Sequence, residues 1–188
     1  IKSFEIIGKE KEKTVEELEA PYASDLAYVT ELGGSSGVKL YESLSGKGKF
    51  TIKTAHKGEK MQLLKEIATN KIYRDLGFSV PNCTLGRDGN SMVSEYIEGA
   101  KQLNAVVSKD RDMIYKEIQK GFVLDALLAN WDVIGGGEDN ILVKDGKVIR
   151  IDNGGSFDVR ARGGSKEFTK VCDEIKTLRE YDTAKSVF

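Results

Sequence analysis

The chain has 188 residues, of which 39% are hydrophobic. This length excludes a closed eight-fold β/α barrel, which needs about 250 residues. It suits one domain, or two small ones that share a cleft. The 29 Lys and Arg residues nearly balance the 30 Asp and Glu residues, which gives a net charge of −1. Because nonspecific nucleic-acid binders are strongly basic, we expect no nucleic-acid partner.

Neither a membrane span nor a secretion signal is visible in the sequence. No apolar run reaches the length of about 18 residues that a membrane helix needs, and the first residues, IKSFEIIGKEKEK, lack the apolar stretch of a signal peptide. We therefore expect a cytoplasmic protein, or an effector or toxin domain delivered into a host cytosol. The chain starts at Ile1, as a domain excised from a longer polypeptide would. Cys83 and Cys172 are too few for a disulfide framework and are expected to be reduced thiols.

The first part of the chain predicts an arm followed by a β-rich unit. Residues 1–27 include the mixed charge run KEKEKTVEELE, which is typical of a solvated arm or helix. Residues 28–99 form the unit, whose five strand-like runs are separated by glycine-rich or polar turns. These runs are 27–33, 38–43, 50–55, 83–86 and 91–97. Apolar residues at helical spacing predict a helix over residues 57–77, so the expected order is β-β-β-α-β-β.

Residues 100–188 predict a second, mainly helical unit. One long buried helix is expected over residues 109–131, and a β-hairpin with Asp145-Gly146 as a type I′ turn is expected over residues 141–152. An amphipathic helix is expected over residues 166–181. The apolar residues on one side of this last helix are Phe168, Val171, Ile175 and Leu178.

A glycine-rich turn joins the first two predicted strands. Its glycines let the backbone approach a ligand closely, and successive unhindered N–H groups can form a concave site for phosphate oxygens. An ordinary turn is the alternative, because glycine-rich hairpins are common and the motif GxxxxGK[ST] is missing. The candidate phosphate-binding residues are Gly33, Gly34, Ser35, Ser36 and Gly37.

Lys53 lies in the third predicted strand, where the period of two places its side chain opposite to those of Phe50 and Ile52. We expect this side chain to face the cleft beside the glycine-rich turn. Glu66, in the helix that follows, can orient the ammonium as an ion-pair partner. A surface lysine and a solvated glutamate are the alternative interpretation.

Three oxygen-bearing side chains surround the predicted hairpin. Asp132 follows the long helix, Asn140 precedes the first strand of the hairpin, and Asp152 ends the second. Magnesium prefers carboxylate and amide oxygens, with phosphates and water completing an octahedron, so Asn140 and Asp152 are candidate ligands. Asp132 is then free to accept a hydroxyl proton. Turn capping by the same three residues is the alternative.

Together these residues resemble the protein-kinase-like fold, specifically its atypical branch of phosphoinositide-type and HipA-like kinases. The resemblance covers most of residues 28–155. In that branch a helix ending in N-x-D-R-H-x-x-N is followed by a hairpin and an Ile-Asp pair, and this chain has Asn130, Asp132, Asn140 and Ile151-Asp152 in that order. The resemblance implies an α+β, two-lobed fold with a five-strand antiparallel N-lobe and a small, mainly helical C-lobe.

The resemblance also implies roles for individual residues. Asp132 is similar to the catalytic-loop aspartate, and Lys53 and Glu66 are similar to the strand lysine and its helix glutamate. Asn140 and Asp152 are similar to the two residues that hold Mg²⁺. The adenine of ATP is implied to lie against Glu95, Tyr96 and Ile97.

The sequence departs from the pattern of the branch after both aspartates. The residues after Asp132 are not Arg and His, and Asn140 comes eight rather than five residues later because of a glycine-rich insertion. Asn153-Gly154 follows Asp152 in place of the usual Phe-Gly.

We therefore expect an ATP- and Mg²⁺-dependent kinase that transfers the terminal phosphoryl group to a hydroxyl. A Ser, Thr or Tyr of a protein substrate is the first expectation, because HipA-like kinases act on proteins. A kinase of inositol lipids or other small alcohols, an enzyme that transfers AMP, and a nucleotide-binding pseudokinase that serves as an interaction module remain as alternatives.

Overall fold

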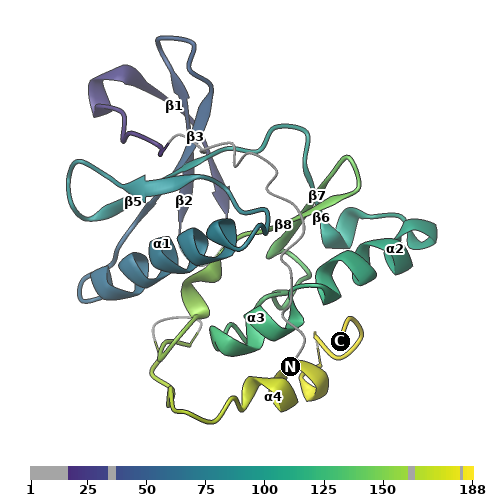
Figure 1. Cartoon of the computed structure of the whole chain (residues 1–188). Helices are drawn as coiled ribbons and strands as arrows, with labels where there is room; N and C mark the ends of the chain where they lie inside the picture. The colour runs from purple at the N-terminus through teal and green to yellow at the C-terminus, as the bar shows by residue number, and fades with distance from the viewer. Residues whose placement is uncertain (1–16, 34–36, 161–163, 183) are drawn as a thin grey trace, which may run out of the picture.

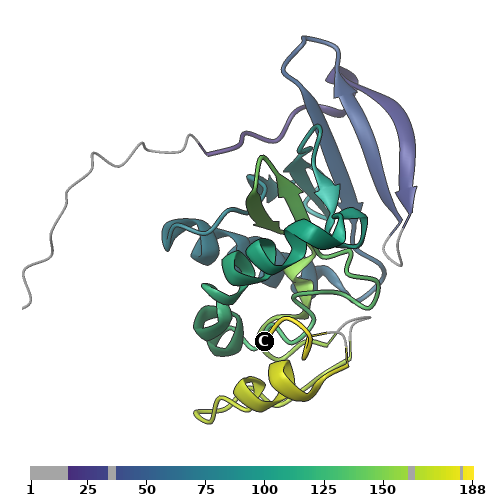
Figure 2. The ribbon, with the colours of Figure 1, turned by 90° about the vertical axis from the view of Figure 1, so that its right-hand side faces the viewer.

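The computed structural model describes residues 17–33, 37–160, 164–182 and 184–188, and within them the fold is α+β. A five-stranded antiparallel sheet and one long helix come first, and a three-stranded sheet with shorter helices follows (Figure 1). Most of the expected N-terminal arm lies outside the described residues. Figure 2 shows the strands β1 and β2 at one end of the molecule and the helix α4 at the other.

The five-stranded sheet confirms the predicted element order. Its strands are arranged as β1-β2-β3-β5-β4, and every neighbouring pair is antiparallel. The elements are β1 (Leu26–Gly33), β2 (Val38–Ser43), β3 (Lys49–Thr54), α1 (Lys60–Asp75), β4 (Cys83–Leu85) and β5 (Ser91–Glu95). Helix α1 ends just before Gly77, whose φ of 83° suits a glycine at a helix terminus. In the central strand β3, Lys53 pairs with Met92 of β5.

The second part of the chain contains the predicted hairpin and one additional short strand. Its elements are β6 (Lys101–Gln102), α2 (Ser108–Gln119), α3 (Phe122–Leu127), β7 (Ile141–Lys144), β8 (Lys147–Arg150) and α4 (Glu174–Glu180). Asp145 and Gly146 have φ values of 50° and 73°, as the predicted type I′ turn requires. The three strands pair in the order β6-β7-β8. A core of buried apolar residues from α2, β7 and the C-terminal segment packs beneath them.

The single long helix predicted over residues 109–131 is wrong, because the chain forms α2 and α3 with a break at Gly121. A Cβ atom at Gly121 would lie 2.0 Å from Nη2 of Arg150. That same Nη2 donates a hydrogen bond of 2.8 Å to the carbonyl of Ile118 near the end of α2. The buried guanidinium of Arg150 therefore occupies the space beside Gly121 and caps the C-terminal end of α2.

The helix predicted over residues 166–181 is also largely wrong, because only Glu174–Glu180 is helical. Of the apolar residues expected on one side, Leu178 is buried, whereas Phe168, Val171 and Ile175 are 50%, 67% and 45% exposed. The segment starts in extended form, with a bridge between Val159 and Ser165. It is held there by Lys166, which donates to two backbone carbonyls.

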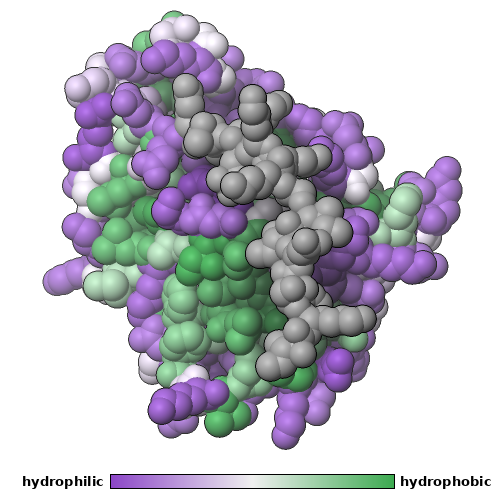
Figure 3. All heavy atoms as spheres, in the orientation of Figure 1, coloured by the Kyte–Doolittle hydropathy of each residue, from purple (hydrophilic) through white to green (hydrophobic). Residues whose placement is uncertain are grey.

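One face of the molecule carries a broad apolar region (Figure 3). Figure 3 shows it over the middle of the face on which Figure 1 draws α3, and that helix exposes Val123 and Leu127. In the part of the chain that the structure describes, no helix combines the length and the apolarity that a membrane span requires. Cys83 and Cys172 are free thiols, as predicted.

Candidate functional site

The predicted lysine, glutamate and aspartate meet at one point. Nζ of Lys53 in β3 lies 2.8 Å from Oε2 of Glu66 in α1 and 2.6 Å from Oδ1 of Asp152, two residues after the end of β8. The side chain of Glu66 is 3% exposed and that of Lys53 is 15% exposed, whereas Asp152 is 48% exposed. Lys53 therefore forms one ion pair with the buried carboxylate of Glu66 and a second with the solvent-accessible carboxylate of Asp152.

The protonation of this trio follows from its burial and its charges. Burial raises the pKa of Glu66 above its usual range, and the nearby Lys53 ammonium opposes that rise only in part. Burial alone would lower the pKa of Lys53, but the charges of Glu66 and Asp152 outweigh it and the pKa is raised. Lys53 therefore carries its positive charge at any physiological pH.

The backbone after β8 is shaped to bring Asp152 to the lysine. Asp152 has a φ of 52°, in the left-handed region that side chains other than glycine rarely adopt. Two residues later, a Cβ atom at Gly154 would lie 2.9 Å from Oε2 of Glu66, so only glycine lets the chain pass this close to α1. Strained residues of this kind persist where the surrounding contacts require them, often at functional sites.

Asp132 and Asn140 are joined although the sequence between them is longer than in the resembled branch. Nδ2 of Asn140 donates to the backbone carbonyl of Asp132 at 2.8 Å. Gly135 makes this possible, because its φ is 79° and a Cβ atom there would lie 2.2 Å from Oδ1 of Asp139. Gly136, in contrast, has open space around it. The insertion therefore folds back on itself and leaves Asn140 in contact with the Asp132 turn.

The environment of Asp132 favours its protonated form. Burial raises the pKa of Asp132 to about 6, and the negative charges of Asp152 and Asp139 add to the rise. A carboxyl group with a pKa near neutrality is suited to accepting and releasing a proton.

Lys166 is a further cation near Asp132, and the sequence analysis did not identify it. Its Nζ donates to the carbonyl of Gly155 at 2.8 Å and to the carbonyl of Ala129. Its side chain is 5% exposed, and burial lowers its pKa to about 8. Lys166 thus connects the turn before Asp132 with the segment after Asp152.

A buried polar network lies next to Lys53, Glu66 and Asp152, and the sequence did not predict it. Of its members, Asn130 was named in the family motif. Arg150 forms a two-pronged ion pair with Asp125, with distances of 2.8 and 2.9 Å. Tyr73 donates its hydroxyl to the same carboxylate at 2.7 Å. Asn70, Asn130 and Asn153 form hydrogen bonds beside it. Apart from Asn130, these residues belong to no recognisable motif, and their only sequence signal is that polar residues interrupt otherwise apolar faces.

The glycine-rich turn is only partly visible. Gly34, Ser35 and Ser36 lie outside the described residues. Gly33 ends β1 and is paired with Val38. Gly37 has a φ of 56°, which favours glycine. The structure therefore shows β1 and β2 paired on either side of the predicted turn, and the role of the turn as a phosphate site stays a prediction.

The three predicted adenine neighbours lie where β5 ends, with Glu95 as its last residue and Tyr96 and Ile97 directly after it. The N–H of Glu95 donates to the carbonyl of Asn82, and the N–H of Tyr96 donates to that of Lys49. Within the described part of the chain, the N–H of Ile97 makes no hydrogen bond. Ile97 is therefore the one of the three whose backbone donor is free for a ligand.

Asn140 and Asp152 have the chemistry of a magnesium site that is completed by phosphate. The amide of Asn140 uses its Nδ2 in the bond to Asp132, which leaves Oδ1 as the atom for a cation. Asp152 offers its exposed carboxylate. Groups of three or more His, Cys, Asp or Glu side chains able to hold a metal do not occur among the described residues. Such a pair suits Mg²⁺, which takes much of its coordination from substrate phosphates and water.

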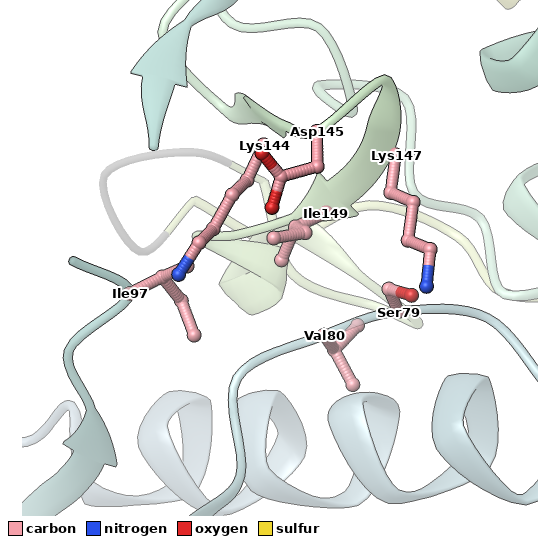
Figure 4. A pocket seen from close by; sticks show the side chains of 7 residues that line it. All are labelled: Ser79, Val80, Ile97, Lys144, Asp145, Lys147 and Ile149. Atoms are coloured by element: carbon pink, nitrogen blue, oxygen red, sulfur yellow. The ribbon is translucent and has the colours of Figure 1, made fainter. Parts of the chain in front are cut away.

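A hollow of about 340 Å³ opens beside Ile97. Its lining residues are Ser79, Val80, Ile97, Lys144, Asp145, Lys147 and Ile149 (Figure 4). Of the residues predicted to bind nucleotide or metal, only Ile97 is among them. This hollow is therefore a different feature from the group around Lys53.

The fold has a solved counterpart among kinases. The crystal structure of the Rio2 kinase-ADP/Mg²⁺-phosphoaspartate complex from Chaetomium thermophilum matches with a TM-score of 0.53 at 14% sequence identity. The fold is protein-kinase-like. The match covers 85% of this chain and 63% of the Rio2 chain, so the protein spans less than two thirds of the kinase chain that it resembles. No family model matches the sequence, and no curated protein does.

Proposed function

We propose that the protein is an ATP- and Mg²⁺-dependent kinase with two lobes, the first around the five-stranded sheet and the second around α2, α3 and α4. The observation that carries the proposal is the contact of Lys53 with Glu66 and Asp152, which come from three separate elements. A buried ion pair costs desolvation energy, so its assembly beside an exposed carboxylate calls for a functional reason. The kinase-like fold supports the same reading.

In this proposal the chain's own residues bind and orient the reactants. Lys53, fixed by Glu66, contacts phosphate oxygens of ATP, and the turn at residues 33–37 covers them. The adenine lies against Glu95, Tyr96 and Ile97 and accepts a hydrogen bond from the backbone N–H of Ile97. Asp132 accepts the proton of the acceptor hydroxyl. The hydroxyl oxygen bonds to the terminal phosphorus of ATP as the bond from that phosphorus to ADP breaks. Positioning and charge stabilisation supply most of the rate in such transfers.

Asn140 and Asp152 would hold the Mg²⁺ ion. Bound there, the ion would neutralise negative charge on the phosphates. Asp152 is well placed for this, because its carboxylate is exposed while the segment that follows it, Asn153–Gly155, packs against α1.

The acceptor in this proposal is a hydroxyl of a protein substrate, as in the HipA-like branch that the sequence resembles. Transfer to a small alcohol or an inositol lipid, transfer of AMP, and nucleotide binding without transfer are the competing functions. A direct assay separates them. The protein is incubated with Mg²⁺ and either γ-labelled or α-labelled ATP, with protein, lipid and small-alcohol acceptors in separate reactions.

The proposal expects label from γ-labelled ATP on a protein acceptor and none from α-labelled ATP. The variants D132N and D152A should abolish this labelling. Labelling from α-labelled ATP would show AMP transfer, and nucleotide binding without either label would show a pseudokinase. If both variants keep wild-type labelling, the site is wrong.

A further inference from the structure

Helix α1 turns one buried polar face toward the second part of the chain. Glu66, Asn70 and Tyr73 occupy this face at helical spacing and are 2%, 3% and 0% exposed. Glu66 contacts Lys53, and the hydroxyl of Tyr73 donates to Asp125 of α3. Asn70, between them, accepts a hydrogen bond from a residue of the site itself.

That residue is Asn153, which follows Asp152 where the resembled kinases have Phe. Asn153 is fully buried. Its Nδ2 donates to Oδ1 of Asn70 at 2.7 Å, and its Oδ1 accepts from Nδ2 of Asn130 at 2.9 Å. We call these three residues, Asn70, Asn153 and Asn130, the asparagine chain.

Each member of the asparagine chain lies next to one residue of the proposed site. Asn70 is one helical turn after Glu66, Asn153 directly follows Asp152, and Asn130 is two residues before Asp132. The two hydrogen bonds therefore couple the three segments that carry these carboxylates. Because buried amides that lose their partners are costly, the bonds favour the single arrangement in which all three segments are in place.

We propose that the asparagine chain positions α1, and with it Glu66, against the segments of Asp132 and Asp152, so that the site is assembled without a modification or a partner protein. Asn70 and Asn153 are positioning residues in this proposal, which rests on the proposed kinase function. In this proposal, the hydrogen bonds of Asn153 hold α1 in place, whereas the Phe at this position in the resembled kinases would do so by apolar packing. The glycine that follows, Gly154, permits the close approach that the bonds require.

A double-mutant cycle tests whether Asn70 acts through Glu66. N70A removes the acceptor of the Asn153 amide while keeping a strong helix former in α1. We expect N70A to lower kcat for phosphoryl transfer at least tenfold in the wild-type background and less than twofold in the E66Q background. Equal losses in both backgrounds would overturn the proposal, since they would show that Asn70 acts independently of Glu66.

Hydrogen exchange of the backbone amides tests the same device without relying on activity. We expect N70A and N153L to speed exchange in α1 (Lys60–Asp75) at least tenfold more than in α2 (Ser108–Gln119). L178A, which truncates a buried residue of α4 outside the asparagine chain, serves as the control at a matched loss of Tm. Because Leu178 packs in the same core as Ile114 and Ile118 of α2, the control should speed exchange in α2 at least as much as in α1. For N70A and N153L, a change spread evenly over both helices would refute the positioning role.

The two measurements also separate this proposal from the proposed function. If the wild-type protein transfers no phosphoryl group, the kinase proposal fails, and hydrogen exchange alone then decides whether the asparagine chain holds α1. Selective loosening of α1 would support it in that case, and uniform loosening would overturn it.

Discussion

The ammonium of Lys53 lies 2.6 Å from the carboxylate of Asp152, although 99 positions separate the two residues in the sequence. Lys53 belongs to β3 of the five-stranded sheet, and Asp152 follows β8 of the second sheet. The contact therefore depends on how the two parts of the chain pack together. A single nucleotide placed beside it can touch groups from both parts.

Replacing Lys53 with Met should lower phosphoryl transfer at least a hundredfold, because the cation that orients the phosphates is lost. It should also destabilise the protein, since Glu66 stays buried without a cation. Removing one partner of a buried pair costs about 3–5 kcal/mol, although Glu66 can reduce the cost by taking up a proton. Its pKa is already raised by burial, so the stability loss should shrink as the pH falls.

Urea unfolding of K53M and wild type at pH 5 and pH 8 measures this difference. K71M is the control, because Lys71 is 56% exposed and forms only surface ion pairs. We expect its unfolding free energy to stay within about 1 kcal/mol of wild type. A K53M protein with full activity would contradict the role of the lysine.

The pKa of Asp132 near 6 predicts the acid limb of the pH profile. Only the ionised carboxylate can accept a proton, so kcat should fall about tenfold per pH unit below pH 6. The same shift has a cost in stability. A carboxyl group whose pKa is higher in the folded than in the unfolded state destabilises the fold above that pKa, and this cost disappears as the pH falls toward about 4.

The variant D132N separates the two effects. Without nucleotide or Mg²⁺, it should be inactive yet have a higher Tm than wild type at pH 8, and the advantage should disappear by pH 4. Thermal unfolding followed by circular dichroism at several pH values checks this. A pH-independent Tm difference would show that the carboxyl group of Asp132 is not perturbed.

The strands and the first helix could be predicted because local signals determine them. Turn residues bound each strand, and the alternation within β3 sets the direction of Lys53. The meeting of Lys53 with Asp152 depends on the packing of two distant segments, and it was expected from the resemblance to kinases. The break at Gly121 could not be predicted, because its cause is Arg150, which is distant in the sequence. Lys166 was missed for a similar reason, since its partners are backbone carbonyls, which every sequence possesses.

The asparagine chain shows the same limit at the site itself. Asn153 was noticed only as a departure from Phe, and the sequence gives no sign that it bonds to Asn70 and Asn130. A buried amide and an exposed one are identical in sequence. Only the packing of α1 against the segment after β8 distinguishes them.

The ion pair between Asp125 and Arg150 should contribute to stability rather than to chemistry. Both side chains are at most 2% exposed, and the guanidinium also caps α2 through Ile118. R150M leaves a buried carboxylate without its cation, so it should cost about 3–5 kcal/mol of unfolding free energy. K120M, which breaks the surface pair with Glu117, is the control and should cost less than about 1 kcal/mol.

Chemical denaturation of R150M and K120M measures both values. At temperatures where R150M stays folded, its KM for ATP should remain close to that of wild type, since neither member of the pair belongs to the proposed nucleotide site. A large rise in KM at full folding would instead place the pair in that site.

Gly154 has no side chain, which lets the segment after Asp152 pass close to Glu66. A Cβ atom there would lie 2.9 Å from Oε2 of Glu66, which must then move away from Lys53. We expect G154A to lose about 1–3 kcal/mol of stability, as overpacked positions do, and to transfer phosphoryl groups at least tenfold more slowly. G136A is the matched control, because a Cβ atom at Gly136 meets nothing within 4 Å. Equal behaviour of the two variants in denaturation and in the labelling assay would show that the close approach of Gly154 to Glu66 has no role in forming the site.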